Sequence, residues 1–171
     1  MSTLKVGAIQ SPTGNAAINI DNAGRITRPN QPVFFARNTG NATLTQADGG
    51  YRKLTTEGTW ATPDVNRGNV FSAGVFTAPV AGIYYIDASI TYSGTATDVG
   101  DGWGIALFKN GTGFTNQEIA YAEGTTSGAE GHTKVSMYLD LAQNDTIEMG
   151  FVGTNESIQF LYWYMGGHLI A

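Results

Sequence analysis

The chain has 171 residues, of which 42% are hydrophobic and 13% are charged, with 23 glycines against five prolines. This composition excludes a disordered chain and fits one ordinary domain with a short appendage, in which tight turns join short strands. A formal net charge of −5 argues against nucleic acid as a partner, and the absence of cysteine excludes disulfides, thiolate metal sites and thiol nucleophiles.

The first ten residues alternate polar and apolar side chains and do not form the apolar segment of a signal peptide. Apolar runs in the rest of the sequence stay shorter than a membrane-spanning length. We therefore expect a soluble protein without membrane insertion that folds in the compartment where it is made.

Residues 1–30 are expected to form a small strand-turn-strand extension. Apolar and polar residues alternate over Leu4 to Ala8, and Ile18 and Ile20 precede the turn-forming sequence Asp21-Asn22-Ala23-Gly24. So few apolar side chains cannot build a core of their own. We therefore expect them to pack against the same residues of neighbouring subunits, which makes this segment an attachment and trimerisation unit.

A break at Arg28-Pro29-Asn30-Gln31-Pro32 separates the extension from a second unit, residues 31–171. Period-2 alternation and β-branched or aromatic residues recur there without helical periodicity, so an all-β sandwich or jelly roll is predicted. The expected strands are Val33 to Arg37, Tyr51 to Leu54, Val70 to Phe71, Ile83 to Tyr92, Trp103 to Lys109, Glu118 to Ala122, Lys134 to Leu141, Thr146 to Val152, Ile158 to Tyr162 and Met165 to Ile170.

Near the C-terminus, residues 160–164 are apolar or amphipathic on both faces of an extended chain. A lone sandwich buries one face of a strand, so the second face is expected to be covered by another subunit, although a loop could also cover it. The predicted trimer-interface residues are Tyr84, Phe160, Tyr162, Trp163 and Tyr164.

Two adjacent segments resemble the signature of the C1q family. They are Asn66-Arg67-Gly68-Asn69-Val70-Phe71 and Gly74-Val75-Phe76-Thr77-Ala78-Pro79-Val80-Ala81-Gly82-Ile83-Tyr84-Tyr85-Ile86. In physical terms the second segment is a short core strand, a corner and the start of a long strand.

Further segments follow in the order of that family. The family's opening strand is similar to Val33 to Arg37, and its mid-domain hairpin is similar to Ala106 to Gly111. Its later strand-turn-strand is similar to Leu139 to Ile147, and its closing strand is similar to Met165 to Ile170. The sequence departs from the family pattern at Asn144, where glycine is usual, and at Met165, where phenylalanine is usual.

The resemblance implies a ten-stranded C1q/TNF-like jelly roll that assembles as a tight homotrimer, serves recognition and has no catalytic residues. The N-terminal piece is similar to connector segments of bacteriophage fibre proteins. Together these resemblances predict a virion protein, assembled in the host cytoplasm, that attaches to a tail or capsid protein through residues 1–30. Its head would then bind a host surface glycan or protein. The alternatives are a decoration or connector subunit of the capsid or tail without a receptor, and an enzyme such as a depolymerase.

The sequence contains none of the nucleophile, metalloprotease or phosphate-loop motifs that we sought, and His132 and His168 are expected to be structural or solvent-facing. The loop carrying Asp98 and Asp101 offers two carboxylates and small residues, which predicts either a calcium site or an ordinary acidic turn. No other cofactor is expected.

Ligand contacts are expected in the polar, glycine-rich loops Asn38 to Gly50, Thr95 to Asp101 and Glu123 to Gly131. Aromatic side chains stack on sugar rings and are enriched at recognition surfaces, although core packing is the alternative for each of them. The predicted ligand-binding residues are Trp103, Tyr92, Tyr121, Asp98 and Asp101.

Overall fold

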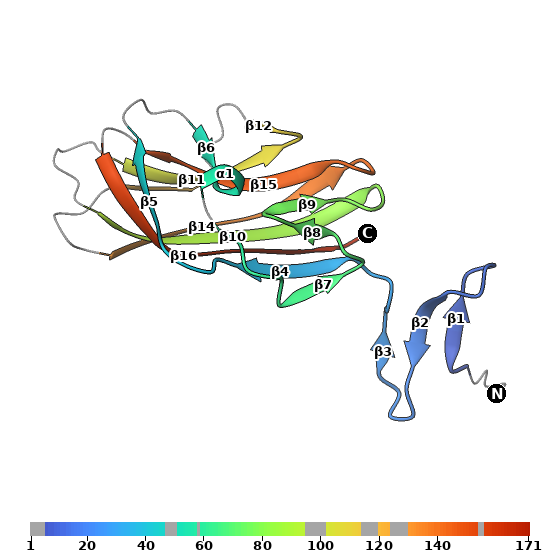
Figure 1. Ribbon diagram of the computed structural model, residues 1–171. Helices are drawn as coiled ribbons and strands as arrows, with labels where there is room; N and C mark the ends of the chain where they lie inside the picture. The colour runs from blue at the N-terminus through green and yellow to red at the C-terminus, as the bar shows by residue number, and fades with distance from the viewer. Residues whose placement is uncertain are drawn as a thin grey trace.

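The structure is a computed structural model. The residues that it describes are all-β except for one helical turn, α1 (Leu54–Glu57), and they form two parts, a small N-terminal sheet and a larger two-sheet sandwich (Figure 1). The residues that it describes are 6–46, 51–57, 59–94, 102–113, 120–123, 130–153 and 156–171.

The N-terminal sheet is antiparallel, in the order β1 (Ala8–Gln10), β2 (Ala16–Ile20) and β3 (Ile26–Thr27). The carboxylate of Asp21 shapes the second turn, because its Oδ1 accepts hydrogen bonds from the backbone nitrogens of Ala23 and Arg25 at 2.8 and 2.9 Å. The expected turn is confirmed, whereas the two-residue strand β3 was not predicted.

One sheet of the sandwich has six strands, and long strands form its centre. Its order is β14 (Glu130–Leu141), β10 (Gly82–Gly94), β16 (Glu156–Leu169), β4 (Val33–Arg37) and β7 (Val65–Arg67), while β5 (Ala42–Gln46) also pairs with β16.

The other sheet has seven strands. Its order is β12 (Thr112–Gly113), β11 (Gly102–Lys109), β15 (Thr146–Gly153), β9 (Val75–Thr77) and β8 (Phe71–Ser72), with β13 (Ala120–Glu123) beside β11 and β6 (Tyr51–Lys53) beside β15.

The core lies between the two sheets and is rich in aromatic side chains. The Phe34 ring stacks on the rings of Phe71 and Phe76, with centroids 5.0 and 4.8 Å apart. Tyr84 is fully buried beside Phe76, and its hydroxyl donates to the Val80 carbonyl at 2.9 Å. Burial raises the pKa of that hydroxyl. The Phe76 and Tyr84 side chains thus anchor both strands of the C1q-like signature segment in the core.

Most predicted strands are confirmed, but several boundaries differ. The two C-terminal strands predicted on either side of Tyr164 form the single strand β16, which continues through Gly166 and Gly167. A Cβ at Gly167 would lie 2.7 Å from the Ile86 side chain and from a neighbouring carbonyl oxygen, so close packing requires glycine there. The structure also contains the unpredicted strands β5 and β7, and β5 lies within the segment expected to be a loop.

Candidate functional site

One row of aromatic side chains crosses the six-stranded sheet on the face opposite the core. Tyr85 on β10 pairs with Tyr138 on β14 and with His168 on β16. The ring of Tyr85 lies 5.5 Å from that of Tyr138 and 5.6 Å from that of His168, measured between centroids. Tyr138 is 69% exposed, so this row lies at the protein surface.

A second group of aromatic residues continues the same face toward the other end of the sheet. Phe35 on β4 and Tyr164 on β16 have ring centroids 5.6 Å apart, and Tyr162 is 68% exposed. Exposed aromatic residues gathered on one face of a soluble protein mark an interaction surface. We call the following six residues the outer face: Tyr85, Tyr138, His168, Phe35, Tyr164 and Tyr162.

Two ion pairs lie on this side of the sheet. Lys134 Nζ lies 3.0 Å from the Asp87 carboxylate, which also accepts a hydrogen bond from the Ser136 hydroxyl at 2.6 Å. The hydrogen bond and charge of Asp87 raise the pKa of Lys134. Arg37 pairs with Asp64 at 3.1 Å. Because these charges have partners within the chain, a covering surface would not have to supply countercharges for them.

His132 lies at the edge of the same surface, on β14. Its Nε2 is 3.1 Å from the Ser89 hydroxyl, and its Nδ1 is 3.1 Å from the Thr91 hydroxyl. Both hydroxyls belong to β10, so the imidazole ties the two strands together. The structure therefore places His132 in the solvent-facing, structural role expected from the sequence.

Two of the predicted interface residues, Tyr162 and Tyr164, belong to the outer face. The other three need correction, because Tyr84, Phe160 and Trp163 are 0%, 1% and 1% exposed within a single chain. Their side chains are covered by the protein's own core and present no surface to a second subunit. The sequence pattern did not identify the other four residues of the outer face, which are Phe35, Tyr85, Tyr138 and His168.

An irregularity in β16 explains the error for Phe160 and Trp163. Tyr92 pairs with Phe160 and Thr91 pairs with Tyr162, so Leu161 is an extra residue in the ladder. This bulge changes the alternation, and Phe160 and Trp163 therefore both point into the core although an odd number of positions separates them.

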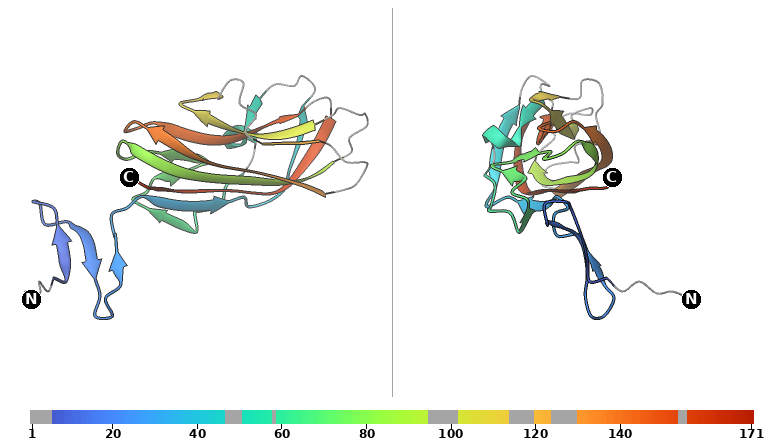
Figure 2. Two further views of the ribbon diagram at one scale, coloured as in Figure 1. Left: turned by 180° about the vertical axis from the view of Figure 1, so that it is seen from behind. Right: turned by 90° about the vertical axis from the view of Figure 1, so that its right-hand side faces the viewer.

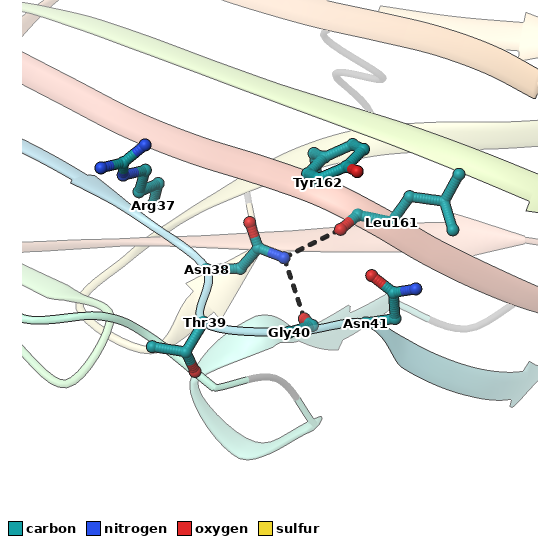
Figure 3. Close-up of a pocket in the computed structure, with 7 residues that line it drawn as sticks. All are labelled: Arg37, Asn38, Thr39, Gly40, Asn41, Leu161 and Tyr162. Atoms are coloured by element: carbon teal, nitrogen blue, oxygen red, sulfur yellow. Dashed lines mark hydrogen bonds between the residues drawn. The ribbon is translucent and has the colours of Figure 1, made fainter.

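The side chain of Asn38 satisfies the backbone groups that the bulge leaves unpaired. Its Nδ2 donates to the carbonyls of Leu161 and Gly40, both at 2.9 Å (Figure 3). Its Oδ1 accepts from the Trp163 nitrogen at 3.3 Å. A pocket of about 230 Å³ lies beside these bonds. Figure 3 shows its lining residues, which are Arg37, Asn38, Thr39, Gly40, Asn41, Leu161 and Tyr162.

This pocket offers limited chemistry to a ligand. The amide of Asn38 is committed to the bulge and the guanidinium of Arg37 to Asp64. The volume also lies below the roughly 300–1,000 Å³ typical of pockets that enclose a small molecule. The pocket is therefore a surface depression beside the exposed ring of Tyr162, with Thr39 and Asn41 on its rim.

A second depression of about 240 Å³ lies where the N-terminal segment joins the sandwich, and Gln31, Val33, Arg67 and His168 line it. Gln31 donates to the Leu169 carbonyl, and Arg67 donates to the Arg28 carbonyl at 3.2 Å. These bonds hold residues 28–32, which we call the linker, against β16 and β7.

The predicted ligand-binding residues do not form one site among the described residues. Tyr92 is 4% exposed, and burial raises the pKa of its hydroxyl, so its ring packs in the core and the prediction of a ligand contact is wrong. Trp103 lies on β11 and Tyr121 on β13, in adjacent ladder positions, but the placement of their side chains is outside what the structure describes. Asp98 and Asp101 also lie outside the described residues.

The described part of the chain contains neither a cluster suited to a metal ion nor a membrane-spanning helix. No group of three or more His, Cys, Asp or Glu residues there is arranged to hold a metal ion. The same residues include no helix with the length and apolarity needed to cross a membrane.

By sequence, the chain matches no known family model and none of the curated proteins. By structure, it is similar to the globular domain of zebrafish complement 1qA protein, with 15% identity, a TM-score of 0.54 and coverage of 82% of this chain and 98% of that one. It is also similar to Eiger TNF from S. frugiperda, with 12% identity, a TM-score of 0.55 and coverage of 84% and 94%.

A third similar structure is murine APRIL, with 14% identity, a TM-score of 0.52 and coverage of 81% and 99%. Each of these neighbours is covered almost completely, whereas part of the present chain has no counterpart in them. These similarities establish the fold: the sandwich is a jelly roll of the C1q and TNF kind.

Proposed function

We propose that this protein is a homotrimeric, non-enzymatic component of a bacteriophage particle whose jelly-roll head recognises a host surface receptor. The observation that carries the trimer is the outer face, which gathers five aromatic side chains and one imidazole on one side of the sheet, beside two ion pairs formed within the chain. Large aromatic side chains at a surface gain most from burial against a partner.

The fold supports a copy of the same chain as that partner. The outer face lies on the opposite side of the sheet from the core, so a second layer against it would bury both faces of β10 and β16. Within one sandwich, the seven-stranded sheet covers only the core side. Association of three chains around a common axis would cover the outer face of each of them.

The placement in a virion rests on the N-terminal piece, whose sequence is similar to fibre connector segments and which stands apart from the head in Figure 1. In this proposal it attaches the trimer to a tail or capsid protein. Three identical heads on one axis would convert weak single contacts with a host glycan or protein into durable attachment, provided that the receptors are dense enough.

A decoration or connector subunit without a receptor is the second candidate. One observation favours it, because the Asn38 and Arg37 side chains of the pocket beside Tyr162 are already committed within the chain. That pocket therefore has few polar groups to offer a specific ligand.

Competition for host cells separates the two candidates. Purified protein added in excess should reduce virion adsorption if the head binds the receptor. Virions carrying Asn41→Ala or Thr39→Ala, two exposed positions of the pocket rim, should then adsorb less while keeping normal particle morphology. Full adsorption in the presence of saturating purified protein would contradict receptor recognition and favour the decoration subunit.

A further inference from the structure

The N-terminal sheet carries four isoleucines on one face. Ile9 on β1 pairs directly with Ile18 on β2, and Ile20 on β2 pairs directly with Ile26 on β3. Residues directly opposite in a ladder share a face, and so do residues two apart in one strand. We call these four residues the isoleucine face. The other side carries Asn19, which pairs with Ala8 and Thr27.

The isoleucine face is uncovered in a single chain. Ile9 is 51% exposed and Ile26 is 64% exposed, while Ile18 and Ile20 are half-buried. Both views in Figure 2 show the N-terminal sheet standing away from the sandwich, so the head does not cover it. A small sheet with one bare apolar face is marginally stable in water, and it needs a second layer.

The four side chains of this face are all aliphatic, so they offer neither a charge nor a hydrogen bond to an unlike partner. The ion pair of Asp21 with Arg25, at 2.6 Å, is in the turn that joins β2 to β3. Such a face is complementary to itself, because apolar side chains pack against one another in any register that excludes water.

The linker fixes where copies of this face would meet. It is held on the head by the Arg67–Arg28 and Gln31–Leu169 bonds, and the Leu169 nitrogen also donates to the Pro32 carbonyl at 3.2 Å. Pro29 and Pro32 restrict its conformations. The N-terminal sheet therefore hangs from β4 and β16, strands that also carry the outer face. Assembly through the outer face would bring three such sheets close together at high effective concentration.

We propose that the isoleucine faces of three copies pack against one another and form a second, separate apolar core on the trimer axis. This inference rests on the homotrimer proposed above and names the partner of residues 6–27. In this arrangement Asn19 and Thr27 point away from the axis, where a tail or capsid protein would meet them.

The absence of cysteine makes a direct test available in the full-length protein. Ile26→Cys places a thiol on the isoleucine face, and Thr27→Cys places one on the opposite face of the same strand. After treatment with a short bismaleimide, Ile26→Cys should give covalently linked dimers on a denaturing gel. Thr27→Cys should stay almost entirely uncrosslinked at the same protein concentration, because neighbouring Thr27 positions would lie far apart.

Light scattering on both variants separates this inference from the trimer itself. A trimeric mass without crosslinking of Ile26→Cys would overturn the isoleucine core and leave the trimer standing. Equal crosslinking of the two variants would also overturn the isoleucine core, because the N-terminal sheets would then have no preferred orientation toward one another. A monomeric mass at all concentrations would overturn the trimer and the isoleucine core together.

Discussion

Asp145 accepts a hydrogen bond from Asn110 at 2.7 Å, and this bond joins two turns that are 35 residues apart in the sequence. The Asp145 carboxylate also accepts from the Ala142 nitrogen at 2.8 Å and lies 2.8 Å from Lys109 Nζ. The Asn110 hydrogen bond, followed by the Lys109 and Ala142 contacts, lowers the pKa of Asp145 to about 2. The turn after β11 is thereby locked to the turn between β14 and β15.

This pKa predicts an acid-dependent loss of stability. Because the folded-state pKa lies below the unfolded value of 3.8, the carboxylate stabilises the fold fully above about pH 4 and loses this effect as the pH falls toward 2. Asp145→Asn should lower the melting temperature at pH 7 and flatten its pH dependence between pH 4 and 2. Asp140→Asn, an exposed carboxylate change on β14, is the control and should leave that dependence intact. A wild-type slope in Asp145→Asn would contradict the prediction.

Asn144 explains one departure from the C1q-like pattern. Its φ of 70° lies in the left-handed region, where glycine is unstrained and asparagine is tolerated better than most residues. Asn144→Gly should therefore change the free energy of unfolding by less than about 0.5 kcal/mol, and Asn144→Val should lower it by roughly 1–2 kcal/mol. Urea titration of both variants checks this. Equal stability of the valine and glycine variants would contradict the backbone argument.

Two glycines with the same backbone conformation should differ in their tolerance of alanine. Gly68 and Gly74 have φ values of 84° and 85°. A Cβ at Gly68 would meet the Val70 side chain at an ordinary 3.4 Å, whereas one at Gly74 would lie 2.8 Å from the Thr55 methyl carbon and closer still to the Trp60 indole nitrogen.

Gly68→Ala should therefore cost roughly 1–2 kcal/mol of backbone strain alone. Gly74→Ala should cost about 3 kcal/mol or more, because overpacking against Trp60 and Thr55 adds to the strain. Thermal unfolding of both variants at one protein concentration gives the comparison. A smaller loss for Gly74→Ala than for Gly68→Ala would show that the Trp60 indole moves away without cost.

Glu148 is a nearly buried carboxylate that ties β15 to β6 and α1. It lies 2.8 Å from Lys53 Nζ and accepts a hydrogen bond from the Thr55 hydroxyl at 2.9 Å. Glu148→Gln should lower the free energy of unfolding by roughly 1–3 kcal/mol, because charge-assisted hydrogen bonds at a buried position are lost. Asp64→Asn removes an exposed ion pair with Arg37 and should cost less than about 1 kcal/mol. Equal losses in the two variants, measured by urea titration, would contradict this ranking.

The fold was predictable because its signals are local. Alternation over β10, the corner at Ala78-Pro79 and the turn at Asp21 each follow from neighbouring residues. The side of the sheet that each aromatic residue faces was not predictable. Tyr84 and Tyr85 are adjacent and chemically identical, yet Tyr84 packs against Phe76 in the core and Tyr85 lies on the outer face. The bulge at Leu161 also depends on pairing with a distant strand.

The outer face could not be assembled from sequence for the same reason. Phe35, Tyr85, Tyr138 and His168 come from four strands, and only the ladder register brings them side by side. The isoleucine face was partly predictable, because the sequence pattern identifies Ile18 and Ile20 as apolar positions of the N-terminal segment. The strand pairing that adds Ile9 and Ile26 to this face comes from the structure.

The mass of the protein in solution tests the central claim most directly. Light scattering should give three times the chain mass of 18.1 kDa for the wild type and for Tyr51→Ser, which changes an exposed tyrosine on the other sheet. Tyr85→Ser combined with Tyr138→Ser should shift the mass toward one chain while the far-ultraviolet circular dichroism spectrum stays unchanged. A wild-type protein that remains at 18.1 kDa at every concentration would contradict the homotrimer.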